Sequence, residues 1–187
     1  MTDYNAIIDK YYPAGTLRRD IYIKHCRQVA DLAVDIARRN RLALDENDIE
    51  AAAMLHDIGI FMTNAPSIGC EGTEKYIAHG YLGARLLRSL GVDEKIVRVA
   101  ETHTGAGITA SDIEMLGLPI PPADYMPRTT LERLVCYADK FYSKSGAMER
   151  KDFRKARASI ARHGGDALAR FDAMASEFGP VGEPANR

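Results

Sequence analysis

The sequence has few of the features that place a protein in a membrane or outside the cell. Its longest apolar runs are only a few residues, whereas a membrane-spanning helix needs roughly 18 to 20. The first residues, MTDYNAIIDKYY, contain no basic region followed by an apolar one, so they do not resemble a signal peptide. We therefore expect a cytoplasmic protein with no membrane partner.

Cysteine is scarce as well. Cys26, Cys70 and Cys136 are odd in number, widely spaced and without a CxxC pattern. This arrangement indicates neither a disulfide framework nor a zinc knuckle. We expect the three thiols to be reduced and to have a structural role.

No charge of one sign dominates the chain. The 25 Lys and Arg residues nearly balance the 26 Asp and Glu residues, which gives a net charge of −1. No global field therefore attracts nucleic acid, and we predict no nucleic-acid partner; any anion site must be local. The 46% of hydrophobic residues excludes a disordered chain, and 187 residues fit one domain or a domain with a small appendage.

Apolar residues recur at helical spacing almost throughout, and no stretch alternates long enough to indicate a strand. The pattern predicts an all-α fold. We expect helices over residues 16–40, 45–56, 75–90, 93–103, 111–116 and 130–142, and two more within 149–178 that separate at 163–165. Residues 63–73 are predicted to form a loop that walls a site, residues 117–127 to be irregular, and residues 181–187 to be frayed.

Histidines and aspartates occupy the apolar faces or ends of successive predicted helices. Burying an imidazole or a carboxylate is costly unless the group is hydrogen-bonded or bound to a cation. One such histidine alone is most simply a hydrogen-bonded core residue, whereas the whole set indicates a bound cation. The set consists of His25, His56, Asp57, His79, His103 and Asp139.

The doublet His56 and Asp57 lies within LHDIG, preceded by His25 and followed by Asp139 in YADK. This pattern resembles the HD superfamily of metal-dependent phosphohydrolases, in its HDIG form, over about residues 16–143. The resemblance implies an all-α HD-domain helical bundle over residues 1–148, with a short C-terminal helical extension, residues 149–187, packed on the same domain.

The resemblance also implies a binuclear metal centre, because His79 in AHGYLGA and His103 in ETHTG match the subgroup with two ions. His25, His56, Asp57 and Asp139 would hold the first ion, and Asp57 would bridge to a second ion held by His79 and His103. Imidazole and carboxylate ligands without a thiolate suit Fe, Mn, Co, Ni or Zn rather than a closed structural zinc site.

Two such ions can activate a bridging water and clamp phosphate oxygens. The implied activity is therefore hydrolysis of a small phosphoester, a nucleotide or a related phosphate, by a metal-bridging hydroxide, with Asp57 in a catalytic role. Lys140 is a further catalytic candidate that could reach a phosphate oxygen or hold the bridging water, and a surface salt bridge is an equally good interpretation.

Other candidates rest on weaker signals. Arg128 precedes a helix N-terminus and could bind substrate, and Thr104 beside His103 could do the same, although a helix-end role is simpler. Glu71 and Glu74 could approach the metals, although solvated loop residues are the default. The basic residues between 150 and 162 are interpreted as a solvated helix face, and His163 as a helix-end residue.

Several functions stay open at the level of sequence. The Gly-Tyr-Pro signature of the cyclic-dinucleotide branch is missing, which disfavours that activity. Enzymes that cleave dinucleoside tetraphosphates share the ligand set, but residues 105–127 and the tail after 145 do not belong to their pattern. The alternatives are a mixed-valent di-iron oxygenase, which uses the same ligands, and a non-catalytic nucleotide-binding module. The tail could cap the site or form the contact of a homodimer.

Overall fold

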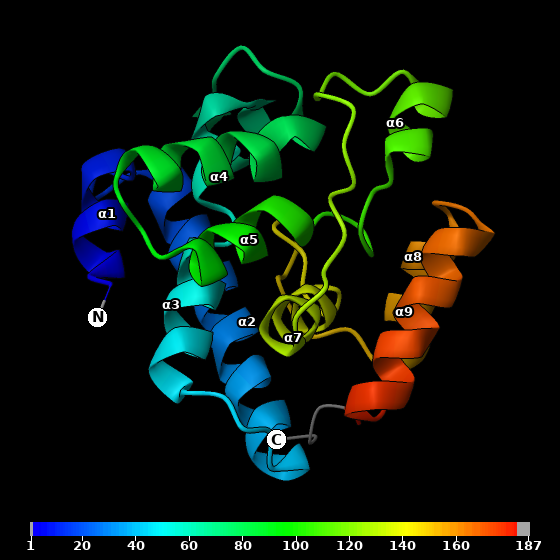
Figure 1. Cartoon of the computed structure of the whole chain (residues 1–187). Coiled ribbons are helices and arrows are strands. Elements are labelled where there is room, and N and C mark those ends of the chain that lie inside the picture. The colour runs from blue at the N-terminus through cyan, green and yellow to red at the C-terminus, as the bar shows by residue number, and fades with distance from the viewer. Residues whose placement is uncertain (1, 183–187) are drawn as a thin grey trace.

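The structure is a computed structural model that describes residues 2–182. Its α-helices are α1 (Tyr4–Tyr11), α2 (Leu17–Asn40), α3 (Glu46–Leu55), α4 (His79–Ser89), α5 (Glu94–Thr102), α6 (Ala110–Leu116), α7 (Thr130–Asp139), α8 (Phe153–Ala161) and α9 (Gly165–Phe178) (Figure 1). Short 3-10 helices are η1 (Ile58–Met62), η2 (Pro66–Ile68) and η3 (Tyr76–Ala78). The predicted all-α class is confirmed.

The helix starts expected from the sequence are set by capping side chains. The side-chain oxygens of the capping residues accept hydrogen bonds from the backbone N–H groups of the first turn, which have no partner inside the helix. These caps are Thr16 for α2, Asp45 for α3, Asp93 for α5 and Thr129 for α7. The predicted ends are less accurate: α3, α4 and α5 each end one residue early, at Leu55, Ser89 and Thr102, and α7 ends at Asp139 rather than Tyr142. Helix α4 also begins at His79 rather than at residue 75, because residues 76–78 form the 3-10 helix η3.

One helix and one small sheet lie outside the sequence-based expectation. Helix α1 begins after Asp3, whose carboxylate accepts the N–H of Ala6. Strands β1 (Asn64–Ala65) and β2 (Cys70–Glu71) pair antiparallel within the predicted loop, so the expectation of a strand-free chain was wrong here. Strands of two residues are too short for an alternating pattern to be visible in the sequence.

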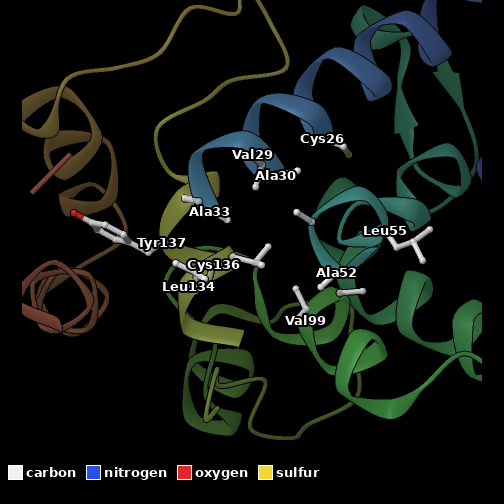
Figure 2. Close-up of a cluster of buried hydrophobic side chains, with 14 of the residues drawn as sticks. Cys26, Val29, Ala30, Ala33, Ala52, Leu55, Val99, Leu134, Cys136 and Tyr137 are labelled. Atoms are coloured by element: carbon white, nitrogen blue, oxygen red, sulfur yellow. The ribbon is translucent and has the colours of Figure 1, made fainter. Parts of the chain in front are cut away.

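The core is formed where α2 packs against α3 and α7, with α5 closing the group. Figure 2 shows the contact, in which small side chains such as Ala30, Ala33 and Ala52 lie between larger ones such as Leu55 and Leu134. Small residues at these positions allow the helix backbones to approach closely, which brings the polar residues on the same helices near one another. All three cysteines are buried, and no disulfide joins them within residues 2–182.

The C-terminal helices pack on the end of α7. The rings of Phe171 and Phe178 lie 5.4 and 5.8 Å from the ring of Tyr137, and the Tyr137 hydroxyl donates to the carbonyl of Gly179. Val181 is buried in the same core, so the expected fraying was wrong at this residue because an apolar side chain finds a core position. The rest of that expectation, residues 183–187, lies outside the described residues.

Across residues 2–182, no helix combines the length and the apolar character that crossing a bilayer requires. Figure 1 shows α6 and the pair α8 and α9 on the same side of α7, away from α1. This arrangement places the segments around α6 and α9 next to the ends of the helices that carry the histidines and aspartates.

Candidate metal centre

The six histidine and aspartate side chains selected from the sequence converge at one place. Each of them is at most 9% exposed. They come from the middle of α2 (His25), the residues just after α3 (His56 and Asp57), the first residue of α4 (His79), the residue just after α5 (His103) and the last residue of α7 (Asp139). Helix packing alone brings these residues together from a span of more than a hundred positions.

Three of the histidines are oriented by the backbone in the same way. Their Nδ1–H groups donate to the carbonyl three residues earlier, and for His56 and His103 that carbonyl lies in the last turn of a helix, where helical partners are missing. The Nδ1 atoms of His56, His79 and His103 lie 2.6, 2.6 and 2.9 Å from the carbonyl oxygens of Ala53, Tyr76 and Ala100. This bond fixes the tautomer, so that in the neutral ring the Nε2 lone pair points into the cluster.

On one side of Asp57, two of these rings face its Oδ1 atom. The Nε2 atoms of His79 and His103 lie 3.4 and 3.3 Å from Oδ1 and 3.0 Å from each other. Because both Nδ1 atoms already carry the proton, the two Nε2 atoms and the carboxylate oxygen are three acceptors with no hydrogen between them. Such a group is repulsive unless a cation lies among the three atoms.

The other oxygen of Asp57 faces a second group. Its Oδ2 atom lies 3.2 Å from the Nε2 of His25 and 3.1 Å from that of His56. Asp139 completes this group, with its Oδ1 atom 3.1 Å from His25 and 3.6 Å from His56. Asp57 therefore lies between two sets of nitrogen and oxygen donors.

The donor set fits a divalent metal ion. Among residues 2–182, the buried Nε2 atoms of His25 and His56 and the Oδ1 atom of Asp57 form no hydrogen bond. The side chains form three overlapping groups of three, and within each group the possible ligand atoms lie within 4.8 Å of one another. Imidazole nitrogens combined with carboxylate oxygens are suitable ligands for Zn, Fe, Mn, Co or Ni.

Electrostatics keep the central carboxylate ionised and two histidines neutral. Burial by itself would raise the pKa of Asp57, but the positive charges of protonated His56 and of Lys144 outweigh burial and hold that pKa well below its ordinary value. A metal ion held by His56 would replace the proton on its Nε2 atom and supply that positive charge instead. Burial lowers the pKa of His79 to about 3 and also lowers the pKa of His103. At neutral pH both rings are uncharged, which is the form that binds metal.

The glycine of the HDIG sequence allows α4 to approach the doublet. A Cβ atom on Gly59 would collide with the carbonyl oxygen of His79 and with the backbone of Gly83. On the other side of η1, the hydroxyl of Tyr12 donates to the carbonyl of Ile58 at 3.1 Å. These contacts fix the turn that carries Asp57 relative to the helix that begins with His79.

Two lysines lie at the centre, and the sequence indicated only one of them. Lys140 is 8% exposed rather than a surface residue, and its Nζ donates to Asp139 Oδ2 at 2.7 Å and to the carbonyl of His103 at 2.8 Å. Lys144 was missed, although its Nζ lies 2.6 Å from Asp57 Oδ2 and its side chain is 15% exposed. It lies in the loop after α7, where no periodicity marks a residue as inward-facing.

A cavity of about 630 Å³ opens beside the cluster. Its inner wall includes His79, His103, Asp139 and Lys140, and Thr104 also lines it. Further walls come from residues 105–108, from the end of α6 and from the turn between α8 and α9, including the helix-end residue His163.

Other sequence candidates lie elsewhere. The segment 63–73 was expected to wall the site but contributes no lining residue; it packs instead near the start of α2, where Gly69 approaches Arg18. Glu71 and Glu74 are exposed and belong to none of the donor groups. Arg128 is exposed and does not line the cavity, because its backbone N–H is held by Glu132 at the start of α7.

The HD domain family model matches residues 22–143, which is well over half of the chain. The chain therefore belongs to the HD domain family, and the resemblance inferred from LHDIG and its flanking residues is confirmed at this level. The assignment to the two-metal subgroup stays a prediction.

Curated relatives have mixed names. The chain is 37% identical over 124 residues to a tRNA (cytidine(56)-2'-O)-methyltransferase of Picrophilus torridus, covering 66% of this chain and 32% of that protein. A protein of the same name from Thermoplasma volcanium is 35% identical over 141 residues, covering 75% and 37%. The chain thus spans about a third of the length of these two relatives. An uncharacterized protein of Methanocaldococcus jannaschii is 35% identical over 136 residues, covering 71% and 73%.

Solved structures with the same fold include the HD domain of the phosphodiesterase PgpH of L. monocytogenes. The TM-score is 0.55 with 17% identity, and the match covers 95% of this chain and 88% of that one. The same domain in complex with cyclic-di-AMP gives a TM-score of 0.53 with 13% identity, covering 100% of both chains. These matches confirm the HD-domain helical fold.

Proposed function

We propose that this protein is a metal-dependent phosphohydrolase that cleaves a small phosphoester at a binuclear centre. His25, His56, Asp57 and Asp139 hold one ion in this proposal, and Asp57, His79 and His103 hold the other. The observation that carries the proposal is the group of three acceptors formed by the Nε2 atoms of His79 and His103 and by Asp57 Oδ1, all within 3.4 Å of one another.

When bound, divalent ions at such a centre activate water and neutralise the charge that develops on a phosphate undergoing in-line displacement. The chain itself supplies positioning and charge. An ammonium group has three N–H donors, and Lys140 uses one for Asp139 and one for the carbonyl of His103. Because Lys140 lines the cavity, its third N–H is available to a phosphate oxygen. Lys144 adds a second positive charge beside Asp57.

The substrate in this proposal is a small phosphorylated molecule, a nucleotide or a related phosphate. The cavity next to His79 and His103 supports this, since its volume lies in the range of about 300 to 1,000 Å³ that is usual for small-molecule sites. The methyltransferase names of two relatives describe whole proteins, of which this chain spans about a third.

We also propose that residues 1–148 form the HD unit and that residues 149–187 are an extension packed on it rather than a separate domain. The contacts of Phe171 and Phe178 with Tyr137 and the burial of Val181 support this division.

The test of the function is product release from a panel of nucleotides, dinucleoside polyphosphates and simple phosphomonoesters, with Mn²⁺, Co²⁺ or Fe²⁺ added. The His56→Ala, Asp57→Ala double variant is the control, and bound metal is measured by mass spectrometry. Release of phosphate or nucleotide by the intact protein alone is the expected result. Bound iron with O₂ uptake, a mixed-valent EPR signal and no phosphate release would replace the hydrolase with an oxygenase.

A further inference from the structure

Exposed apolar side chains gather around one cavity. Within residues 2–182, the large hydrophobic side chains that remain exposed are Leu17, Tyr76, Leu90, Met115 and Leu116. Three of these five, Tyr76, Met115 and Leu116, line the cavity beside the metal centre. Met115 and Leu116 are 73% and 63% exposed, and they lie at the end of α6. Neighbouring exposed apolar side chains at a cavity mouth indicate a surface that a ligand covers.

The wall that carries Met115 and Leu116 is a small folded unit packed on η3 and α4. Ile108, Ile113, Ile120 and Tyr125 form an apolar cluster with Ala78 of η3, separate from the main core. Two backbone hydrogen bonds between Ile108 and Tyr125, of 3.1 and 2.8 Å, close this unit. The segment 105–127 is therefore an ordered wall with an apolar face, not a loose loop.

The opposite wall combines small and charged residues and is tied to the first. Gly164, Gly165 and Ala167 line the cavity at the start of α9, with Asp166 and Arg170 beside them. One turn further along, Arg170 donates to the carbonyl oxygens of Ala106 and Gly107 at 3.1 Å each. These bonds hold the C-terminal extension at a fixed distance from the segment 105–127, so the space between the two walls is built into the fold.

We propose that this cavity is a subsite for a planar heteroaromatic ring, such as a nucleobase, carried by the phosphoester. Met115 and Leu116 are its specificity-determining residues. The placement of the phosphate at His79 and His103 rests on the function proposed above. The ring then lies between the end of α6 and the small residues at the start of α9.

The mixture of walls favours a ring with a polar edge over an aliphatic chain. The apolar side is suited to a flat face, and a thioether such as that of Met115 makes favourable contacts with aromatic rings. Thr104 and Asp166 also line the cavity, and side chains of these types can hydrogen-bond a ring edge. An inorganic phosphate or a sugar phosphate would leave the apolar walls uncovered.

The test compares ligands that differ only in the ring. Adenosine, guanosine, cytidine and uridine 5'-monophosphates and ribose 5-phosphate are titrated calorimetrically into the full chain loaded with Mn²⁺. Phosphate release is measured in the same samples, so that binding and turnover are read separately. The variant is Leu116→Ser, and the matched control is Leu17→Ser, because Leu17 is 58% exposed but lies outside the cavity.

We expect at least one nucleotide to bind more tightly than ribose 5-phosphate. Leu116→Ser should weaken the binding of that nucleotide by about tenfold and leave the binding of ribose 5-phosphate unchanged. The reason is that the loss of one apolar group from a pocket lowers affinity by roughly 10- to 200-fold. Leu17→Ser should change neither. Met115→Ser serves as a second variant, and thermal melting confirms that the variants are folded.

Equal binding of all nucleotides and ribose 5-phosphate, or unchanged nucleotide binding in both cavity variants, would overturn the inference. The two proposals fail separately. Ring-dependent binding without hydrolysis under any metal would reject the hydrolase and keep the subsite, whereas equally efficient hydrolysis of ribose 5-phosphate and the nucleotides would keep the hydrolase and reject the subsite.

Discussion

The two sides of the cavity beside the histidine and aspartate cluster are formed by different kinds of residue. The metal side consists of buried histidines, aspartates and Lys140, held by backbone carbonyls and at most 9% exposed. The opposite side consists mostly of apolar and small residues around α6 and α9, with Asp166 and Arg170 among them, and Met115 and Leu116 are more than 60% exposed. On the metal side, the positions of the side chains are fixed by burial and hydrogen bonds. Among the described residues, the other side contains no candidate metal ligand, and in the proposal above it selects the substrate.

The largest effect is expected on the metal side. Asp57→Ala removes both oxygens that face the histidine pairs, so metal content should fall and hydrolysis should drop by at least about 10³-fold. Metal analysis and phosphate release measure the two effects. Asp35→Ala is the control, because Asp35 is exposed and pairs only with Arg39. Full metal content with full activity in Asp57→Ala would contradict the assignment of the centre.

A backbone change should also disturb the metal side. Gly59→Ala places a Cβ against the carbonyl of His79 and the backbone of Gly83, and overpacking of this kind costs about 1 to 3 kcal/mol. We expect this loss in the free energy of unfolding, measured with urea, together with weaker metal binding as His79 moves. Gly165→Ala is the control, since no atom lies within 4 Å of the added Cβ. Equal stability of the two variants would show that η1 and α4 can separate without cost.

The difference between the two sides of the cavity also explains which features could be predicted from the sequence. The starts of the helices could be predicted from capping residues such as Asp93 and Thr129. The cluster of histidines and aspartates could be predicted from polar residues in apolar positions. Both signals are local in the sequence. The six selected side chains do converge, and their role as ligands stays a proposal. Lys144 could not be found, because it lies in a loop without periodicity.

The second side of the cavity was invisible to the same reasoning. Leu116 belongs to a short helix and Arg170 to an amphipathic one, and nothing local marks either as part of a site. Only the packing of residues 105–127 against α9 places these residues opposite His79 and His103. In the proposal above, these residues take part in a site through a tertiary contact, and the spacing of residues in the sequence does not indicate that contact.

A charge change at the border between the two sides should have an intermediate effect. Lys144 places a positive charge 2.6 Å from Asp57 Oδ2, and like charges at such distances oppose the binding of a cation. Lys144→Gln should therefore raise the affinity for Mn²⁺ by about tenfold in a calorimetric titration, since about 1.4 kcal/mol of relieved repulsion suffices. The exposed Lys155→Gln variant should leave the affinity unchanged. Weaker Mn²⁺ binding in Lys144→Gln would mean that the lysine supports the site instead of opposing the ion.

The smallest effect is expected where the two walls are tied together. Arg170→Met removes the hydrogen bonds to the carbonyls of Ala106 and Gly107, which should cost about 1 to 2 kcal/mol of stability. The walls can then shift, so KM for the preferred substrate should rise roughly three- to tenfold while metal content and kcat stay nearly constant. Arg157→Met is the control, because its exposed ion pair with Asp172 contributes only about 0 to 1 kcal/mol. A loss of metal or of kcat in Arg170→Met would show that the two sides of the cavity are coupled, whereas a change confined to KM would establish that chemistry and selection are separate in this fold.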